Sequence, residues 1–176
     1  MEIENPTKVT HYAILIGIND YPLPPLKACV RDVQEIKKYL EEKLKDSVRI
    51  RMITTSPNNK SSPHHVINSD EWPTYANVKS AFKEVDSIAK PGDYVYIHYS
   101  GHGTRKLPCD EQSNKTEGKN AGTTKGDLAL VLLSEREGQP GICLWGFELE
   151  SLLKMLADRR LIISRLLLLW ERLPWP

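Results

Sequence analysis

The chain has 176 residues and a formal net charge of +1, with 40% hydrophobic and 27% charged residues. This length fits one domain, and the composition is that of a globular protein, which excludes an intrinsically disordered chain. Lys and Arg are spread along the chain and the net charge is close to zero. There is therefore no electrostatic reason to expect a nucleic acid or an anionic membrane surface as a partner.

The three cysteines, Cys29, Cys109 and Cys143, are widely spaced. This is not a disulfide framework, and no Cys/His cluster has the spacing of a zinc site, so we expect reduced thiols and no metal. The N-terminus has no basic stretch followed by an apolar one, and the longest apolar run, 161–170, is shorter than the roughly 18–20 residues of a spanning helix. These features favour the cytoplasm or the nucleus.

Apolar β-type runs alternate with helical patterns along the chain. The run YAILIGI at 12–18 is apolar on both faces, which is typical of a strand buried in a parallel sheet. Further strands are predicted at 48–53, 94–99 and 128–133, and amphipathic helices at 28–44, 74–89 and 147–157, with Thr74 as a candidate N-cap. This order predicts an α/β fold with a mainly parallel sheet and right-handed crossovers.

The segment 161–176 (LIISRLLLLWERLPWP) takes the place of the next strand in this alternation. Its leucine-rich run contains Arg165 and is followed by Pro174 and Pro176, an unusual composition for a buried strand. We therefore expect loose packing after about Ile163. An unfinished sheet would leave an unpaired strand edge, through which the chain could associate with a second copy or another protein.

The most informative segment is 99–104 (YSGHGT), directly after the strand predicted at 94–99. Sites in open parallel sheets form beyond the carboxyl ends of the strands, and a histidine there can act as a general base or acid. Gly101 and Gly103 beside His102 lack a Cβ, so a peptide could approach the backbone, and the Gly103 N–H could donate to an oxyanion. The alternative is a tight turn with a solvent-facing histidine.

This motif resembles the histidine motif of the caspase and metacaspase superfamily of cysteine peptidases. Three other segments are similar to that family in the same order: HYAILIGINDYPLPPLKACVRDV (11–33), GDLALVLL (126–133) and WGFELESLL (145–153). The resemblance is nearest in character to fungal caspase-like proteins. It implies a three-layer caspase–haemoglobinase-like fold, incomplete at its C-terminus, with an N-terminal extension (1–9), a partial p20-type domain (10–163) and a divergent tail (164–176).

The resemblance also implies a role for each matched residue. His102 would be the dyad histidine, and Gly103 would lend its N–H to the oxyanion hole. The residues matching Cys29, Asp32 and Ser100 line the primary specificity pocket of metacaspases, where an acidic Asp32 would favour a substrate Arg or Lys. From the residues alone, Asp32 can equally be a first-turn acid favoured by the helix dipole, and Cys29 a small buried apolar residue.

The family's nucleophile is a cysteine in a segment resembling Asp-x-Cys-His-Ser-Gly, at the end of the strand after the helix matched by 147–157. Here that place holds 161–170, which contains no cysteine. Cys109 is the alternative candidate, but its loop supplies no rigidity to hold a thiolate within about 3 Å of the base, and Asp110 would raise the thiol pKa. No nucleophile is identified, and the carboxylates that bind calcium in many metacaspases are absent, so no cofactor is expected.

The resemblance thus predicts a cysteine-endopeptidase domain for peptide or protein substrates that lacks its nucleophile and is inactive or nearly so. The alternative is a pseudo-protease that serves as a peptide- or protein-interaction module. A nucleotide-binding α/β protein is disfavoured, because residues 17–20 after the first strand contain no glycine-rich phosphate loop and no Walker-type lysine.

Overall fold

A computed structural model describes residues 9–22, 25–55, 71–105, 128–135 and 141–172, the last ten of these by their backbone alone. Strands and helices alternate as predicted, in the order β1 (His11–Gly17), α1 (Cys29–Leu44), η1 (Lys45–Ser47), β2 (Val48–Thr54), α2 (Tyr75–Ile88), β3 (Tyr94–Arg105), β4 (Leu128–Leu132), β5 (Ile142–Trp145), α3 (Gly146–Asp158) and β6 (Ile162–Arg172). None of the helices in these ranges is long and apolar enough to cross a membrane.

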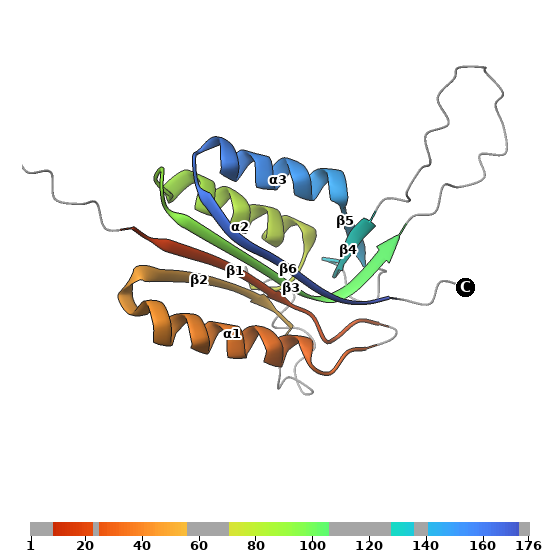
Figure 1. The fold of residues 1–176 in the computed structure, drawn as a ribbon. Coiled ribbons are helices and arrows are strands. Elements are labelled where there is room, and N and C mark those ends of the chain that lie inside the picture. Colours follow the sequence, from red (N-terminus) through yellow and green to blue (C-terminus); the bar gives the residue numbers. More distant parts are fainter. Residues whose placement is uncertain (1–8, 23–24, 56–70, 106–127, 136–140, 173–176) are drawn as a thin grey trace, which may run out of the picture.

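The six strands form one sheet, in which β1 lies between β2 and β3 and pairs parallel with both. The strand β6 pairs parallel with β3 along the edge opposite β1, while β4 and β5 add an antiparallel hairpin at the end of β3. Helix α1 covers one face of the sheet, and α2 and α3 cover the other (Figure 1). The predicted α/β fold with a mainly parallel sheet is confirmed.

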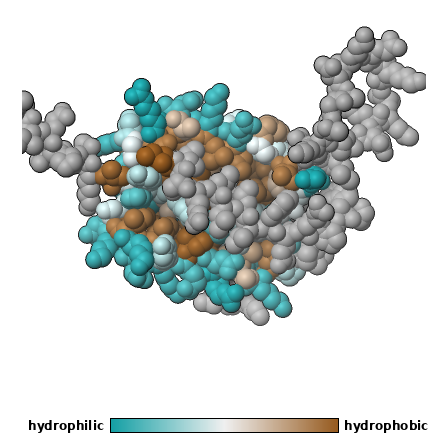
Figure 2. Space-filling model, in the orientation of Figure 1, coloured by the Kyte–Doolittle hydropathy of each residue, from teal (hydrophilic) through white to brown (hydrophobic). Residues whose placement is uncertain are grey.

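The core has two layers because β1 is buried on both faces. Ile14 and Ile16 lie in the larger cluster with Phe82 of α2, whereas Leu15 packs with Val33 of α1. Burial of such side chains supplies the main stabilisation, at about 25 cal/mol per Å² of apolar surface. Figure 2 shows hydrophilic residues over the outer surfaces of the helices and hydrophobic residues in the band between the two helical layers.

The element boundaries agree closely with the predicted ones, with two exceptions. The Oγ1 atom of Thr74 accepts a hydrogen bond from the Asn77 N–H at 3.2 Å, so Thr74 is the N-cap of α2 as expected. However, β3 does not end at Tyr99: it continues through the whole YSGHGT motif to Arg105. The short strand β5 was not predicted, because its four residues are too few for a periodic pattern.

The backbone after about Ile163 is paired into the sheet, whereas the prediction of loose packing there stays a prediction. Residues 162–172 form a strand that pairs with β3 from Tyr94 to Gly103, with a register shift between Val95 and Tyr96. The physical reason is that, without β6, the edge of β3 opposite β1 would present unpaired N–H and C=O groups. Satisfying those groups outweighs the unusual composition of the segment.

Hydrogen exchange checks the pairing of β6. We expect those amides of 166–170 that face β3 to exchange within about tenfold of the amides of 95–99 in β3, because both strands belong to one ladder. Two-dimensional NMR spectra recorded after transfer to D₂O measure both sets in one sample. Exchange of 166–170 at the rate of an unstructured peptide, with 95–99 still protected, would contradict the pairing.

Candidate active site

The histidine motif lies inside the sheet, at the carboxyl end of β3. The Ile18 N–H donates to the Ser100 carbonyl at 3.0 Å, which joins the end of β1 to the motif. His102 is only 1% exposed and Ser100 only 2%. The alternative of a tight turn with a solvent-facing histidine is therefore wrong.

Two tyrosine hydroxyls hold the backbone of His102. The His102 N–H donates to the Tyr21 hydroxyl at 2.9 Å, and the Tyr99 hydroxyl donates to the His102 carbonyl at 2.6 Å. The two hydroxyl oxygens are 3.0 Å apart, and both lie within hydrogen-bonding distance of the Val131 carbonyl, at 2.9 Å from Tyr21 and 2.8 Å from Tyr99. The Tyr21 ring also lies beside the imidazole of His102, with centroids 4.4 Å apart and a tilt of 47°.

Burial strengthens the preference of this pair for the protonated form. Removal from water raises the pKa of Tyr21 well above its usual range, although its hydrogen bonds to Tyr99 and His102 oppose the shift. Burial also raises the pKa of Tyr99, and the neighbouring Tyr21 raises it further. Both phenols consequently keep their protons at physiological pH and remain hydrogen-bond donors.

Gly101 is required by these tyrosines. A Cβ at Gly101 would lie 2.5 Å from the Tyr21 hydroxyl oxygen and 2.7 Å from that of Tyr99. We interpreted this glycine from the sequence as a place where a peptide could approach the backbone. In the structure, the space beside it is filled by the protein's own side chains.

Gly103 is buried and has a strand on each side. The register pairs it with Leu130 of β4 and with Arg172 of β6. A donor to an oxyanion has to face the position where the negative charge develops. The role of the Gly103 N–H as such a donor stays a prediction.

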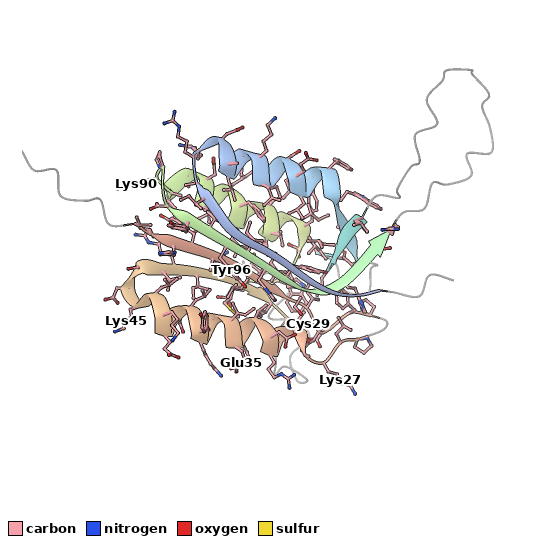
Figure 3. All side chains as sticks on the ribbon, viewed as in Figure 1. Lys27, Cys29, Glu35, Lys45, Lys90 and Tyr96 are labelled. Carbon is pink, nitrogen blue, oxygen red and sulfur yellow. The ribbon has the colours of Figure 1, made fainter. Side chains whose placement is uncertain are left out.

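The residues predicted to line a specificity pocket come together at the start of α1. The Ser100 hydroxyl donates to an oxygen of the half-buried Asp32 carboxylate at 3.4 Å. Cys29 is buried one turn earlier, and Figure 3 shows it at the N-terminal end of α1. A Cβ at Gly17 would lie 2.8 Å from the Cys29 carbonyl oxygen, so this glycine lets α1 approach the end of β1.

His98 was not singled out from the sequence. It pairs in register with Leu15 and lies on the face of β3 that packs against α1, with its ring 6.4 Å from that of Tyr96 and nearly parallel to it. Its side chain is fully buried, and neither ring nitrogen has a hydrogen-bond partner in the described part of the chain. Burial lowers the pKa of His98, while the carboxylate of Asp32 opposes the shift. The only signal in the sequence is a polar residue in the apolar run YVYIHY.

The thiol of Cys143 is not activated. Cys143 of β5 lies opposite Val131 in the hairpin, and burial raises its pKa, which favours the unreactive thiol form. Cys109 lies outside the described residues. The register places Trp170, Glu171 and Arg172 of β6 beside Gly101, His102 and Gly103, so no cysteine occupies the strand next to the histidine.

No metal site is apparent within the ranges given above. They contain no group of three or more His, Cys, Asp or Glu side chains arranged to hold a metal ion. The resemblance to metacaspases raises calcium as a possible ligand. This part of the chain contains no cluster of carboxylates that would bind it.

Comparison with known proteins identifies the family. The family model described as "Metacaspase, peptidase C14 domain" matches residues 11–125, which is more than half of the chain and includes both the α1 segment and the histidine motif. The chain belongs to the metacaspase family. The family resemblance seen in the sequence is thereby confirmed, although the roles of individual residues remain predictions.

Plant and fungal metacaspases are both similar to this chain. Metacaspase-6 of Arabidopsis thaliana is 30% identical over 123 residues, which are 68% of this chain and 30% of that protein. Metacaspase-7 of the same plant is 36% identical (59% of this chain, 24% of that protein), and Metacaspase-1 of Eremothecium gossypii is 35% identical (58% and 22%). The chain thus matches less than a third of the length of these curated relatives.

A crystal structure of protein GSU0716 from Geobacter sulfurreducens is similar in fold. It superimposes with a TM-score of 0.55 and 20% sequence identity, covering 83% of this metacaspase-family chain and 45% of that one. At this level of identity the likeness concerns the fold alone, and it is consistent with the caspase-like arrangement.

Replacing Gly101 tests the close packing against the tyrosines. We expect Gly101→Ala to lower the free energy of unfolding by about 1–3 kcal/mol, because the added methyl overlaps two buried hydroxyls. Urea denaturation measures the loss. The matched control is Gly146→Ala, where the new Cβ would meet only the Leu128 carbonyl, at 3.3 Å. Equal stability of the two variants would show that the tyrosines move aside freely.

The buried His98 predicts a loss of stability in acid. Its folded-state pKa lies below the ordinary value near ~6.5, so at lower pH the unfolded chain binds more protons than the folded one. The free energy of unfolding should therefore fall from about pH 7 to pH 5. His98→Leu should flatten this dependence in urea titrations, whereas His11→Leu, at a half-buried site, should retain it. The same slope in wild type and His98→Leu would contradict the assignment.

Proposed function

We propose that this metacaspase domain binds peptide or protein segments that carry Arg or Lys and does not cleave them. His102 would be the family's dyad histidine, present without its nucleophile. The observation that carries this proposal is that the strand beside the histidine, β6, contains no cysteine. We also propose, from the sequence features described above, that the protein is located in the cytoplasm or the nucleus.

Covalent catalysis by a cysteine requires a thiolate within about 3 Å of the base, with an oxyanion donor beyond it. The backbone positions nearest His102 in β6 are occupied by Trp170, Glu171 and Arg172. Gly103, the expected oxyanion donor, is flanked by strands. Without a nucleophile, residual catalysis from binding and an oxyanion hole would be lower by orders of magnitude.

The binding half of the site is better supported. Asp32 has an exposed portion, and its carboxylate has lone pairs beyond the one that accepts the long hydrogen bond from Ser100. A guanidinium group can form two parallel hydrogen bonds with such a carboxylate, and an ammonium group can pair with it as a point charge. Asp32 lies in the first turn of α1, where the helix dipole favours a negatively charged side chain. A segment bearing Arg or Lys is therefore the ligand class that this site fits.

A second mode of association uses the sheet. Among the described residues, no strand pairs with the edge of β6 that faces away from β3. Such an edge presents unpaired backbone groups to which a strand of another chain can add. A strand from a second copy or from an active relative is the occupant that this geometry supports.

Peptide binding tests whether the charge of Asp32 recognises the ligand. A fluorescent peptide with a central Arg should bind the wild type, and Asp32→Asn should weaken binding about tenfold, because the variant keeps the shape and loses the charge. Fluorescence anisotropy measures the affinity. The matched control, Glu35→Gln, removes an exposed charge from the outer side of α1 (Figure 3) and should leave it unchanged.

Mass spectrometry of the same peptide after prolonged incubation should show no cleavage. Cleavage that is lost in Cys29→Ala, Cys109→Ala or Cys143→Ala would mean that the domain is an active peptidase with a nucleophile we did not identify. Equal affinity for peptides with Arg and with Gln at the central position would contradict the role of Asp32.

A further inference from the structure

The ladder between β3 and β4 stops one residue short of the histidine. Gly103 pairs with Leu130, and the two following pairs continue the antiparallel register to Arg105 and Leu128. In this register, the next pair would be His102 and Val131. The hydroxyls of Tyr21 and Tyr99 lie between these two residues instead and bind both of them.

We propose that Tyr21 and Tyr99 are positioning residues for His102. Their hydroxyls form an insert in the sheet that takes the place of one ladder pair and fixes the histidine relative to β4. The proposal rests on the assignment, in the proposed function, of His102 as the family's dyad histidine, and it adds the groups that orient this histidine.

Because peptide bonds are planar, the insert can fix the backbone conformation of His102. The His102 N–H belongs to the peptide plane before its Cα, and the His102 carbonyl belongs to the plane after it. Tyr21 holds the first plane and Tyr99 holds the second. Both backbone dihedral angles of His102 are thereby fixed. The second plane also contains the Gly103 N–H, so Tyr99 sets the direction of that donor as well.

One arrangement of the protons in the network satisfies both the His102 and the Val131 carbonyl. The two hydroxyls have one proton each, and the His102 N–H provides a third. All three are used when His102 donates to Tyr21, Tyr21 to the Val131 carbonyl and Tyr99 to the His102 carbonyl. The Tyr21 ring additionally covers one side of the imidazole, with 4.4 Å between the ring centroids. The insert consequently restrains both the backbone and the ring of His102.

The insert also connects the histidine to the β4–β5 hairpin. Val131 pairs with Cys143 across the hairpin while its carbonyl accepts a hydrogen bond from Tyr21 and lies 2.8 Å from the Tyr99 hydroxyl. A displacement of β4 would alter these hydrogen bonds before it reached His102. Val131 therefore links the hairpin to the site, together with the ladder that begins at Gly103.

NMR spectroscopy of the full chain tests the insert. Tyr21→Phe retains the ring and removes the acceptor of the His102 N–H, so the His102 amide should exchange about tenfold faster relative to the Ile97 amide. Tyr99→Phe should shift the carbonyl carbon resonance of His102. The matched control is Tyr75→Phe, whose hydroxyl binds Glu148 between α2 and α3. It should leave both His102 signals unchanged.

The ratio of His102 to Ile97 exchange separates positioning from general stability. If both amides change by the same factor in Tyr21→Phe, and the His102 carbonyl does not shift in Tyr99→Phe, the tyrosines only stabilise the fold and the proposal is wrong. If the variants fail to fold, NMR spectra of the wild type test the proposal instead. A slowly exchanging Tyr21 hydroxyl proton close to the His102 amide supports the insert, and its absence contradicts it. Absence of peptide binding to the wild type would contradict the proposed function alone.

Discussion

The pairing of β3 on both edges is the constraint on which the rest of the structure depends. Residues 94–100 are in register with β1 on one side, and the same residues face β6 on the other. From Ile97 to Gly103 this strand is also buried on its faces, so every polar side chain there must find a partner or bear the cost of burial. The tyrosine hydroxyls at His102 and the Ser100–Asp32 contact are solutions to this requirement, whereas His98 is left without one.

Most of the fold followed from the sequence because its signals are local. Apolar runs, one-sided helical stripes and the Thr74 cap are properties of short segments, and the parallel order follows from their alternation. The length of β3 could not be predicted in this way. The motif YSGHGT contains two glycines and a serine, which are typical of a turn, and only pairing with β4 and β6 shows it to be a strand.

The site was predicted less completely than the fold, because its geometry depends on contacts between distant segments. Tyr21 lies in a loop of prolines 81 positions before His102, and nothing in the local pattern indicates that its hydroxyl binds the histidine backbone. The meaning of Gly101 changed for the same reason. A glycine beside a candidate base suggests space for a substrate, but here the space belongs to two side chains from elsewhere in the chain.

These contacts also show that the presence of the histidine motif does not by itself indicate activity. Ser100, Gly101 and His102 are almost fully buried, and the packing of β3 and the tyrosine insert requires residues of about their size. A domain that had lost its nucleophile would keep much of the histidine motif for stability alone. Asp32 is different, because it is half exposed and its bond to Ser100 is long. A neutral residue could replace it in α1 with only the modest loss of a helix-dipole interaction. Asp32, and not the histidine, is therefore the residue whose charge reports whether this site still binds a ligand.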